Sequence, residues 1–97
     1  MSILNGILQE EYDRLNRVIY RIEQELSELP KGYISEKKIN GKVYYYLQYR
    51  ENGRIKSIYL KGDDIELYRS LINHRNELRT KLKQLQGDRK KIEKILD

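Results

Sequence analysis

The 97-residue chain is long enough for one small domain and too short for a large buried core. Charged residues make up 36% of it and apolar residues 38%, a polar composition typical of long helices exposed to solvent. It has no cysteine, which excludes disulfides, thiolate zinc sites and cysteine nucleophiles. No segment approaches the roughly 18 apolar residues of a membrane span, and residues 1–8 lack the pattern of a signal peptide, so we expect a cytoplasmic protein.

The net charge of +5 is concentrated in the middle of the chain. Residues 30–62 carry eight basic and two acidic side chains, a net +6. Residues 1–29 have three basic and six acidic side chains, a net −3, and residues 63–97 have nine and seven, a net +2. A localised positive field attracts phosphate groups or an acidic protein surface.

The first expected element is a long amphipathic helix at about residues 3–28. From Tyr12 onward its apolar residues recur at steps of three and four, the spacing of a heptad seam. Ser2 or Asn5 can cap its start, and Pro30 ends it because the residue before a proline avoids the α region. The apolar stripe consists of Leu4, Leu8, Tyr12, Leu15, Ile19, Ile22, Leu26 and Leu29.

The middle of the chain predicts three strands, at about residues 33–39, 43–50 and 54–61, which are rich in Tyr, Ile and Val. Asn40-Gly41 and Asn52-Gly53 separate them. Asn-Gly favours the type I′ turn, which needs positive φ at both central residues. Two such turns predict an antiparallel three-stranded meander.

A second long helix is expected at about residues 64–86, with Asp63 or Asp64 as its N-cap. Gly87-Asp88 predicts a break followed by a short C-terminal helix. Arg75 and Arg89 fall on its heptad seam, where we favour a structural role through pairing with helix 1 or setting register. The apolar stripe consists of Ile65, Tyr68, Leu71, Ile72, Leu78, Leu82, Leu85, Ile92 and Leu96.

These elements predict a single α+β domain over residues 1–97, with two long helices flanking a three-stranded antiparallel sheet. Three arrangements fit the pattern. The helices can pair as an antiparallel coiled coil that carries the sheet, they can fold across one face of the sheet, or the seam can join two chains in a homodimer.

The two-residue turns also predict strand register. Ile39 then faces Lys42 and Glu51 faces Arg54, so the side chains divide between two faces. The expected core face carries Ile34, Val43, Tyr45, Leu47, Tyr49, Ile58 and Leu60, with Glu36, Lys38 and Lys56. The other face is expected to be wholly or partly exposed and carries Tyr33, Ser35, Lys37, Ile39, Tyr44, Tyr46, Gln48, Arg50, Ile55, Ser57, Tyr59 and Lys61.

The second face is the main candidate for a binding site. Tyrosine rings can stack on unpaired bases, and Lys and Arg can neutralise phosphates. The same residues also suit a sheet that binds nothing, because Tyr is a good strand residue and edge lysines prevent aggregation. The candidate nucleic-acid or partner-binding residues are Tyr33, Lys37, Tyr44, Tyr46, Arg50, Tyr59 and Lys61.

No catalytic, metal-binding or cofactor-binding motif is present in the sequence, so we expect a protein that is not an enzyme. His74 is the only histidine, and a single histidine without cysteine is not a metal motif.

The segment from Leu29-Pro30-Lys31-Gly32 through the tyrosine-rich hairpin and into the second helix resembles a group of small uncharacterised bacterial and phage proteins. Three strands followed by a helix is more distantly similar to the amino-terminal arm-binding domain of phage-type integrases, whose sheet inserts into DNA. That similarity implies contacts from Lys37, Tyr44, Tyr46, Arg50 and Tyr59.

Three functions remain open at this point. The leading hypothesis is a basic accessory protein that binds DNA or RNA through the tyrosine-bearing face. The second is a protein–protein interaction module, such as an adaptor or a phage-encoded inhibitor of a nucleic-acid-processing machine. The third is a purely structural coiled-coil protein, in which the helices of the chain bury this face.

Overall fold

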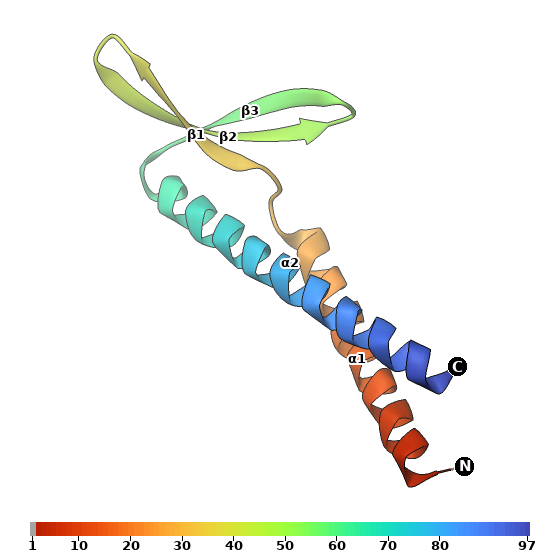
Figure 1. Cartoon of the computed structure of the whole chain (residues 1–97). Helices are drawn as coiled ribbons and strands as arrows, with labels where there is room; N and C mark the ends of the chain where they lie inside the picture. The colour runs from red at the N-terminus through yellow and green to blue at the C-terminus, as the bar shows by residue number, and fades with distance from the viewer. Residues whose placement is uncertain (1) are drawn as a thin grey trace. The chain divides into compact units, whose positions relative to one another are not determined.

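The computed structural model describes residues 2–97, which form two helices and three strands. In chain order these are α1 (Ile3–Glu28), β1 (Tyr33–Ile39), β2 (Lys42–Glu51), β3 (Arg54–Leu60) and α2 (Gly62–Leu96) (Figure 1). The predicted α+β class is confirmed. Two compact units are present: the N-terminal segment through Glu28 with Glu77–Asp97, and Leu29–Asn76.

In the helical unit, α1 and the C-terminal part of α2 pair in antiparallel order. The Tyr12 hydroxyl donates to Glu93 Oε1 at 3.2 Å, and Arg89 Nη1 donates to Asn16 Oδ1 at 3.0 Å. As residue numbers rise along α1, the numbers of their partners on α2 fall, which is the pattern of an antiparallel pair. Arg89, predicted on the seam, thus bonds to an amide of α1, and its Nε also lies 4.0 Å from Glu93 Oε1 on its own helix.

The apolar seam of this unit follows the predicted heptad spacing. Burial of aliphatic side chains stabilises the pair by about 1.5–3 kcal/mol for each fully buried residue. Amphipathic helices of this kind are marginal alone in water, so each depends on the other. The seam consists of Leu15, Ile19 and Ile22, which are buried on α1, and of Leu78, Leu82, Leu85, Ile92 and Leu96, which are half-buried on α2.

Polar contacts organise the first half of α1. Ser2 Oγ accepts a hydrogen bond from the Asn5 backbone N–H at 3.1 Å, so Ser2 provides the N-cap. Further along the helix, hydrogen bonding from the exposed Arg14 guanidinium holds the pKa of the Glu11 carboxyl below its ordinary value.

α2 differs from the expectation because it runs without interruption from Gly62 to Leu96. The predicted break at Gly87-Asp88 is therefore wrong. A glycine inside a helix costs only about 0.5–1 kcal/mol relative to alanine, and half-buried Leu85 and Arg89 flank this glycine on the seam. The predicted cap is also displaced, since Asp63 and Asp64 lie within the first turn, where they favour the helix dipole.

The sheet has the predicted order β1-β2-β3 and the predicted register. The φ angles are 52° and 81° at Asn40 and Gly41, and 52° and 77° at Asn52 and Gly53, as type I′ turns require. Ile39 pairs with Lys42, and Glu51 with Arg54.

One face of the sheet forms the apolar core of this unit. Leu47 is 4% exposed and Leu60 is 2% exposed. Burial decreases toward the turns, so the predicted core face is buried only around its centre. Ile34, Tyr45 and Tyr49 are half-buried, whereas Val43 and Ile58 are each 43% exposed.

Candidate functional site

The tyrosine face is the sheet face opposite Leu47 and Leu60. Side chains alternate along a strand, so the observed pairing places the even-numbered residues of β2 on this face with the odd-numbered residues of β1 and β3. Tyr33 and Tyr59 are 58% and 47% exposed. Tyr44 and Tyr46 are half-buried. The face is thus partly open to solvent, as the alternation predicts.

Three tyrosines on this face form one aromatic cluster. The Tyr59 ring centroid lies 5.6 Å from that of Tyr46 and 6.1 Å from that of Tyr44, with interplanar angles of 55° and 53°. Tilted pairs at such distances stabilise a sheet by about 0.5–1.5 kcal/mol beyond their buried area. The Lys37 ammonium lies 4.9 Å from the Tyr46 centroid, within the range of a cation–π contact. A cation therefore borders the ring cluster.

Charge is divided unequally between the two sides of the sheet. By the observed pairing, the acidic strand residues Glu36 and Glu51 both lie on the core side, where Glu51 pairs with Lys56 at 3.3 Å. Among the described strand residues, those on the tyrosine face that carry a charge are all basic: Lys37, Lys42 and Arg50. The core side carries three basic strand residues, Lys38, Arg54 and Lys56, beside these two acids, so the strand residues give the tyrosine face a net charge of +3 and the core side a net charge of +1.

A pocket of about 380 Å³ lies where the chain enters β1. We call it the entry pocket, and it is lined by Lys31, Gly32, Tyr33, Gln48, Tyr49, Arg50 and Ile55. Gly32 has φ of 110°, and a Cβ atom at this position would overlap the carbonyl oxygen of Gln48. The absence of a side chain at residue 32 therefore lets the chain cross close to β2.

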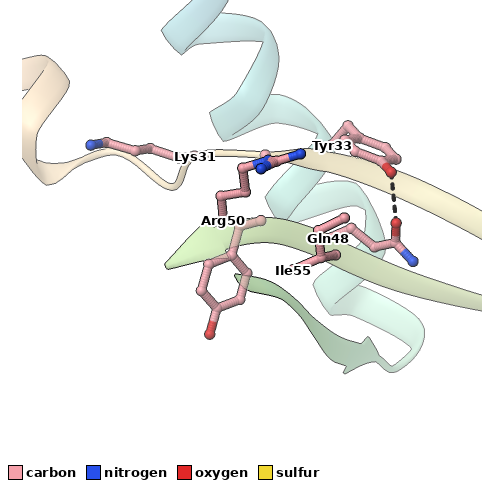
Figure 2. A pocket seen from close by; sticks show the side chains of 7 residues that line it. Lys31, Tyr33, Gln48, Arg50 and Ile55 are labelled. Carbon is pink, nitrogen blue, oxygen red and sulfur yellow. Dashed lines mark hydrogen bonds between the residues drawn. The ribbon is translucent and has the colours of Figure 1, made fainter. Parts of the chain in front are cut away.

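One hydrogen bond fixes two of the polar groups in this pocket. The Tyr33 hydroxyl donates to Gln48 Oε1 at 2.6 Å (Figure 2). Since Oε1 accepts this bond, the Nε2 group of Gln48 is left as a donor. Figure 2 shows the Arg50 side chain rising from β2 on the side where Tyr33 lies, whereas the Lys31 amine extends in another direction.

The structure brings most of the predicted site residues into two neighbouring groups. Lys37, Tyr44, Tyr46 and Tyr59 meet in the aromatic cluster, while Tyr33 and Arg50 line the entry pocket. Lys61 lies after the end of β3, and its carbonyl accepts the Asp64 N–H at 2.7 Å. Among the described residues, Lys61 belongs neither to the aromatic cluster nor to the lining of the entry pocket.

Five residues that line the entry pocket were not among the predicted site residues: Lys31, Gly32, Gln48, Tyr49 and Ile55. Tyr49 had been assigned to the core face. The strand register is enough to predict that Lys31 lies near Arg50. Tyr33 pairs with Gln48, so continuing that pairing two residues toward the N-terminus places Lys31 opposite Arg50. Gln48 and Ile55 were assigned to the correct face. Alternation along the strands could not show that they line a pocket, because the pocket depends on how the side chains pack.

Two other features are absent from residues 2–97. No group of three or more His, Cys, Asp or Glu side chains there is arranged to hold a metal ion. Over the same part of the chain, no helix has an apolar stretch long enough to cross a bilayer.

Comparison with known proteins gives a family but no fold relative. No curated protein and no solved structure matches the chain. A family model described as a domain of unknown function, DUF6788, matches residues 12–69. That range is more than half of the chain and contains the whole sheet, both groups of candidate residues and the start of α2. The protein therefore belongs to the DUF6788 family.

Proposed function

We propose that this protein is a small binding module, without catalytic activity, that binds nucleic acid through the tyrosine face. The observation that carries the proposal is the partly exposed cluster of Tyr44, Tyr46 and Tyr59 beside basic side chains, on a face without acidic strand residues. The similarity to the arm-binding domain of phage-type integrases stays a prediction from the sequence.

The chemistry of this face suits a polyanion that carries aromatic bases. Stacking of a base on a tyrosine ring contributes about 1–3 kcal/mol. Each phosphate neutralised by Lys37, Lys42 or Arg50 releases counterions, so the affinity should fall steeply as salt rises. Because Tyr59 and Tyr33 present exposed ring surface, stacking requires little rearrangement of the sheet.

Fluorescence anisotropy tests the proposal directly. Labelled duplex DNA, single-stranded DNA and RNA are titrated with the protein at about 50 mM and 200 mM salt. We expect micromolar or tighter binding of at least one nucleic acid at low salt, steep loss at high salt, and weaker binding by Tyr46→Ser. Tyr20→Ser is the matched control, since Tyr20 is 64% exposed on α1. Absence of binding to all three nucleic acids at low salt contradicts the proposal.

A second candidate function is binding of a partner protein through the same face. It is favoured by Ile39 and Ile55, which are 47% and 64% exposed on the tyrosine face. Tyrosine and arginine are also common in the energetic centres of protein interfaces. If nucleic acid does not bind, a pull-down with the wild type and Ile55→Lys would test this alternative.

The purely structural hypothesis requires a covered tyrosine face, and the exposed rings of Tyr33 and Tyr59 count against it. The cytoplasmic location and the homodimer through helix seams stay predictions. Light scattering in solution would test the homodimer, because a monomeric mass would contradict it.

A further inference from the structure

The entry pocket differs from the rest of the tyrosine face because it is hollow and has polar groups on its wall. Its volume of about 380 Å³ is near the lower end of the usual range for small-molecule pockets, about 300–1,000 Å³. A space of this size suits one small aromatic group better than a long apolar segment.

We infer that the entry pocket receives a single unpaired nucleobase of a nucleic-acid strand, with its neighbouring phosphates at Arg50 and Lys31. This inference rests on the proposed function and adds to it a preference for single strands over duplex. In a duplex the bases are stacked and paired, so none can enter a pocket unless it is first extruded.

The wall of the pocket offers the contacts that an unpaired base needs. The exposed ring of Tyr33 provides a stacking surface, and Ile55, 64% exposed, provides an apolar contact. The Gln48 amide is oriented by its 2.6 Å hydrogen bond from Tyr33, which leaves Nε2 to donate to a carbonyl oxygen or ring nitrogen of a base.

The two basic side chains of the pocket are placed to bind the phosphates on either side of that base. Arg50 stands on β2 beside the ring and amide, while Lys31 precedes Gly32 and extends another way (Figure 2). The guanidinium group can bind one phosphate in a bidentate manner, and the flexible amine can reach a second one. The strand would then continue across the same face toward the basic Lys37 and the aromatic cluster.

The test compares three probes of equal length: a thymidine single strand, a duplex that contains it, and a chain of abasic deoxyribose phosphates. Anisotropy titrations use the wild type, Tyr33→Leu and Gln48→Leu, with Tyr20→Leu as the control for loss of an exposed tyrosine. Circular dichroism checks that each variant is folded. Tyr33 is exposed and Gln48 is half-buried, so we expect the fold to persist.

If the pocket holds a base, the wild type binds the thymidine strand more tightly than the duplex. Tyr33→Leu then weakens thymidine-strand binding about tenfold, in keeping with stacking of one base. Gln48→Leu also weakens this binding. Both variants bind the duplex and the abasic chain within about twofold of the wild type, because those probes present no free base.

Two results overturn the inference and are distinguishable. If the wild type binds nucleic acid but the pocket variants weaken no probe, or weaken the abasic chain as much as the thymidine strand, the pocket does not hold a base although the proposed function stands. If the wild type binds none of the three probes, the proposed function fails and the inference fails with it.

Discussion

Gly32 passes over β2 so closely that any side chain at residue 32 would overlap the backbone carbonyl of Gln48. The φ angle of 110° at Gly32 is also one that residues with a Cβ rarely adopt. This crossing joins the segment after α1 to the start of β1 and shapes the entry pocket. The identity of one small residue thus bears on both the fold and the candidate site.

Replacement of this glycine should destabilise the protein strongly. For Gly32→Ala we expect a loss of about 1–3 kcal/mol or more in the free energy of unfolding, from backbone strain together with the overlap. Urea unfolding followed by circular dichroism measures it. Gly6→Ala is the control, because no atom lies within 4 Å of the Cβ position at that helical glycine. An unchanged unfolding midpoint for Gly32→Ala would contradict the described crossing.

The opposite effect is expected at the glycine inside α2. Gly87→Ala should stabilise the protein by about 0.5–1 kcal/mol, because the helix continues through this residue and the Cβ position is open. If the helix instead ended at Gly87 with a left-handed residue, alanine would destabilise it. The direction of the shift in the urea midpoint therefore distinguishes a continuous helix from a broken one.

The hydrogen bond between Arg89 and Asn16 should contribute to pairing of the helices. A double-mutant cycle with Asn16→Ala and Arg89→Ala is expected to give a coupling energy of about 0.5–1.5 kcal/mol. The Arg89 side chain is 31% exposed, so solvent screens this contact only partly. Strictly additive effects of the two substitutions on unfolding would show that the bond contributes nothing measurable.

Much of the fold follows from short-range signals that act independently of the rest of the chain. Asn40-Gly41 and Asn52-Gly53 both adopt positive φ, and once those turns are fixed the pairing of every strand residue follows. Heptad spacing likewise identified Leu15, Ile19 and Ile22 as the buried seam of α1. These features depend on local turn chemistry and periodicity, which a sequence displays directly.

Other features depend on competition between local and tertiary effects. Gly87 carries a local signal to end a helix, but the seam contacts on both sides of it outweigh a cost of about 1 kcal/mol. At the site, alternation placed Tyr46 opposite Tyr59, whereas the diagonal contact between Tyr44 and Tyr59 depends on twist and side-chain rotamers. The entry pocket depends on a crossing outside the regular strands, which no periodicity describes.

The two faces of the sheet provide a matched pair of lysines for testing electrostatics. Lys37 lies on the tyrosine face near Tyr46, and Lys38 follows it on the opposite face. For single-stranded DNA, Lys37→Gln should reduce the slope of log affinity against log salt by about 0.7, the value for one phosphate contact. Lys38→Gln should leave the slope unchanged. Equal effects of the two substitutions would indicate only a general attraction to positive charge.

The most direct measurement of the central claim is an NMR titration of the tyrosine ring signals with single-stranded DNA. Tyr44, Tyr46 and Tyr59 lie on the tyrosine face, whereas Tyr45 lies on the core side of the same sheet and Tyr20 lies on α1. Stacking of bases predicts large ring-signal shifts for the first group and small shifts for the second. Shifts confined to Tyr45 and Tyr20, or no shift in either group at saturating DNA, would contradict binding through the tyrosine face.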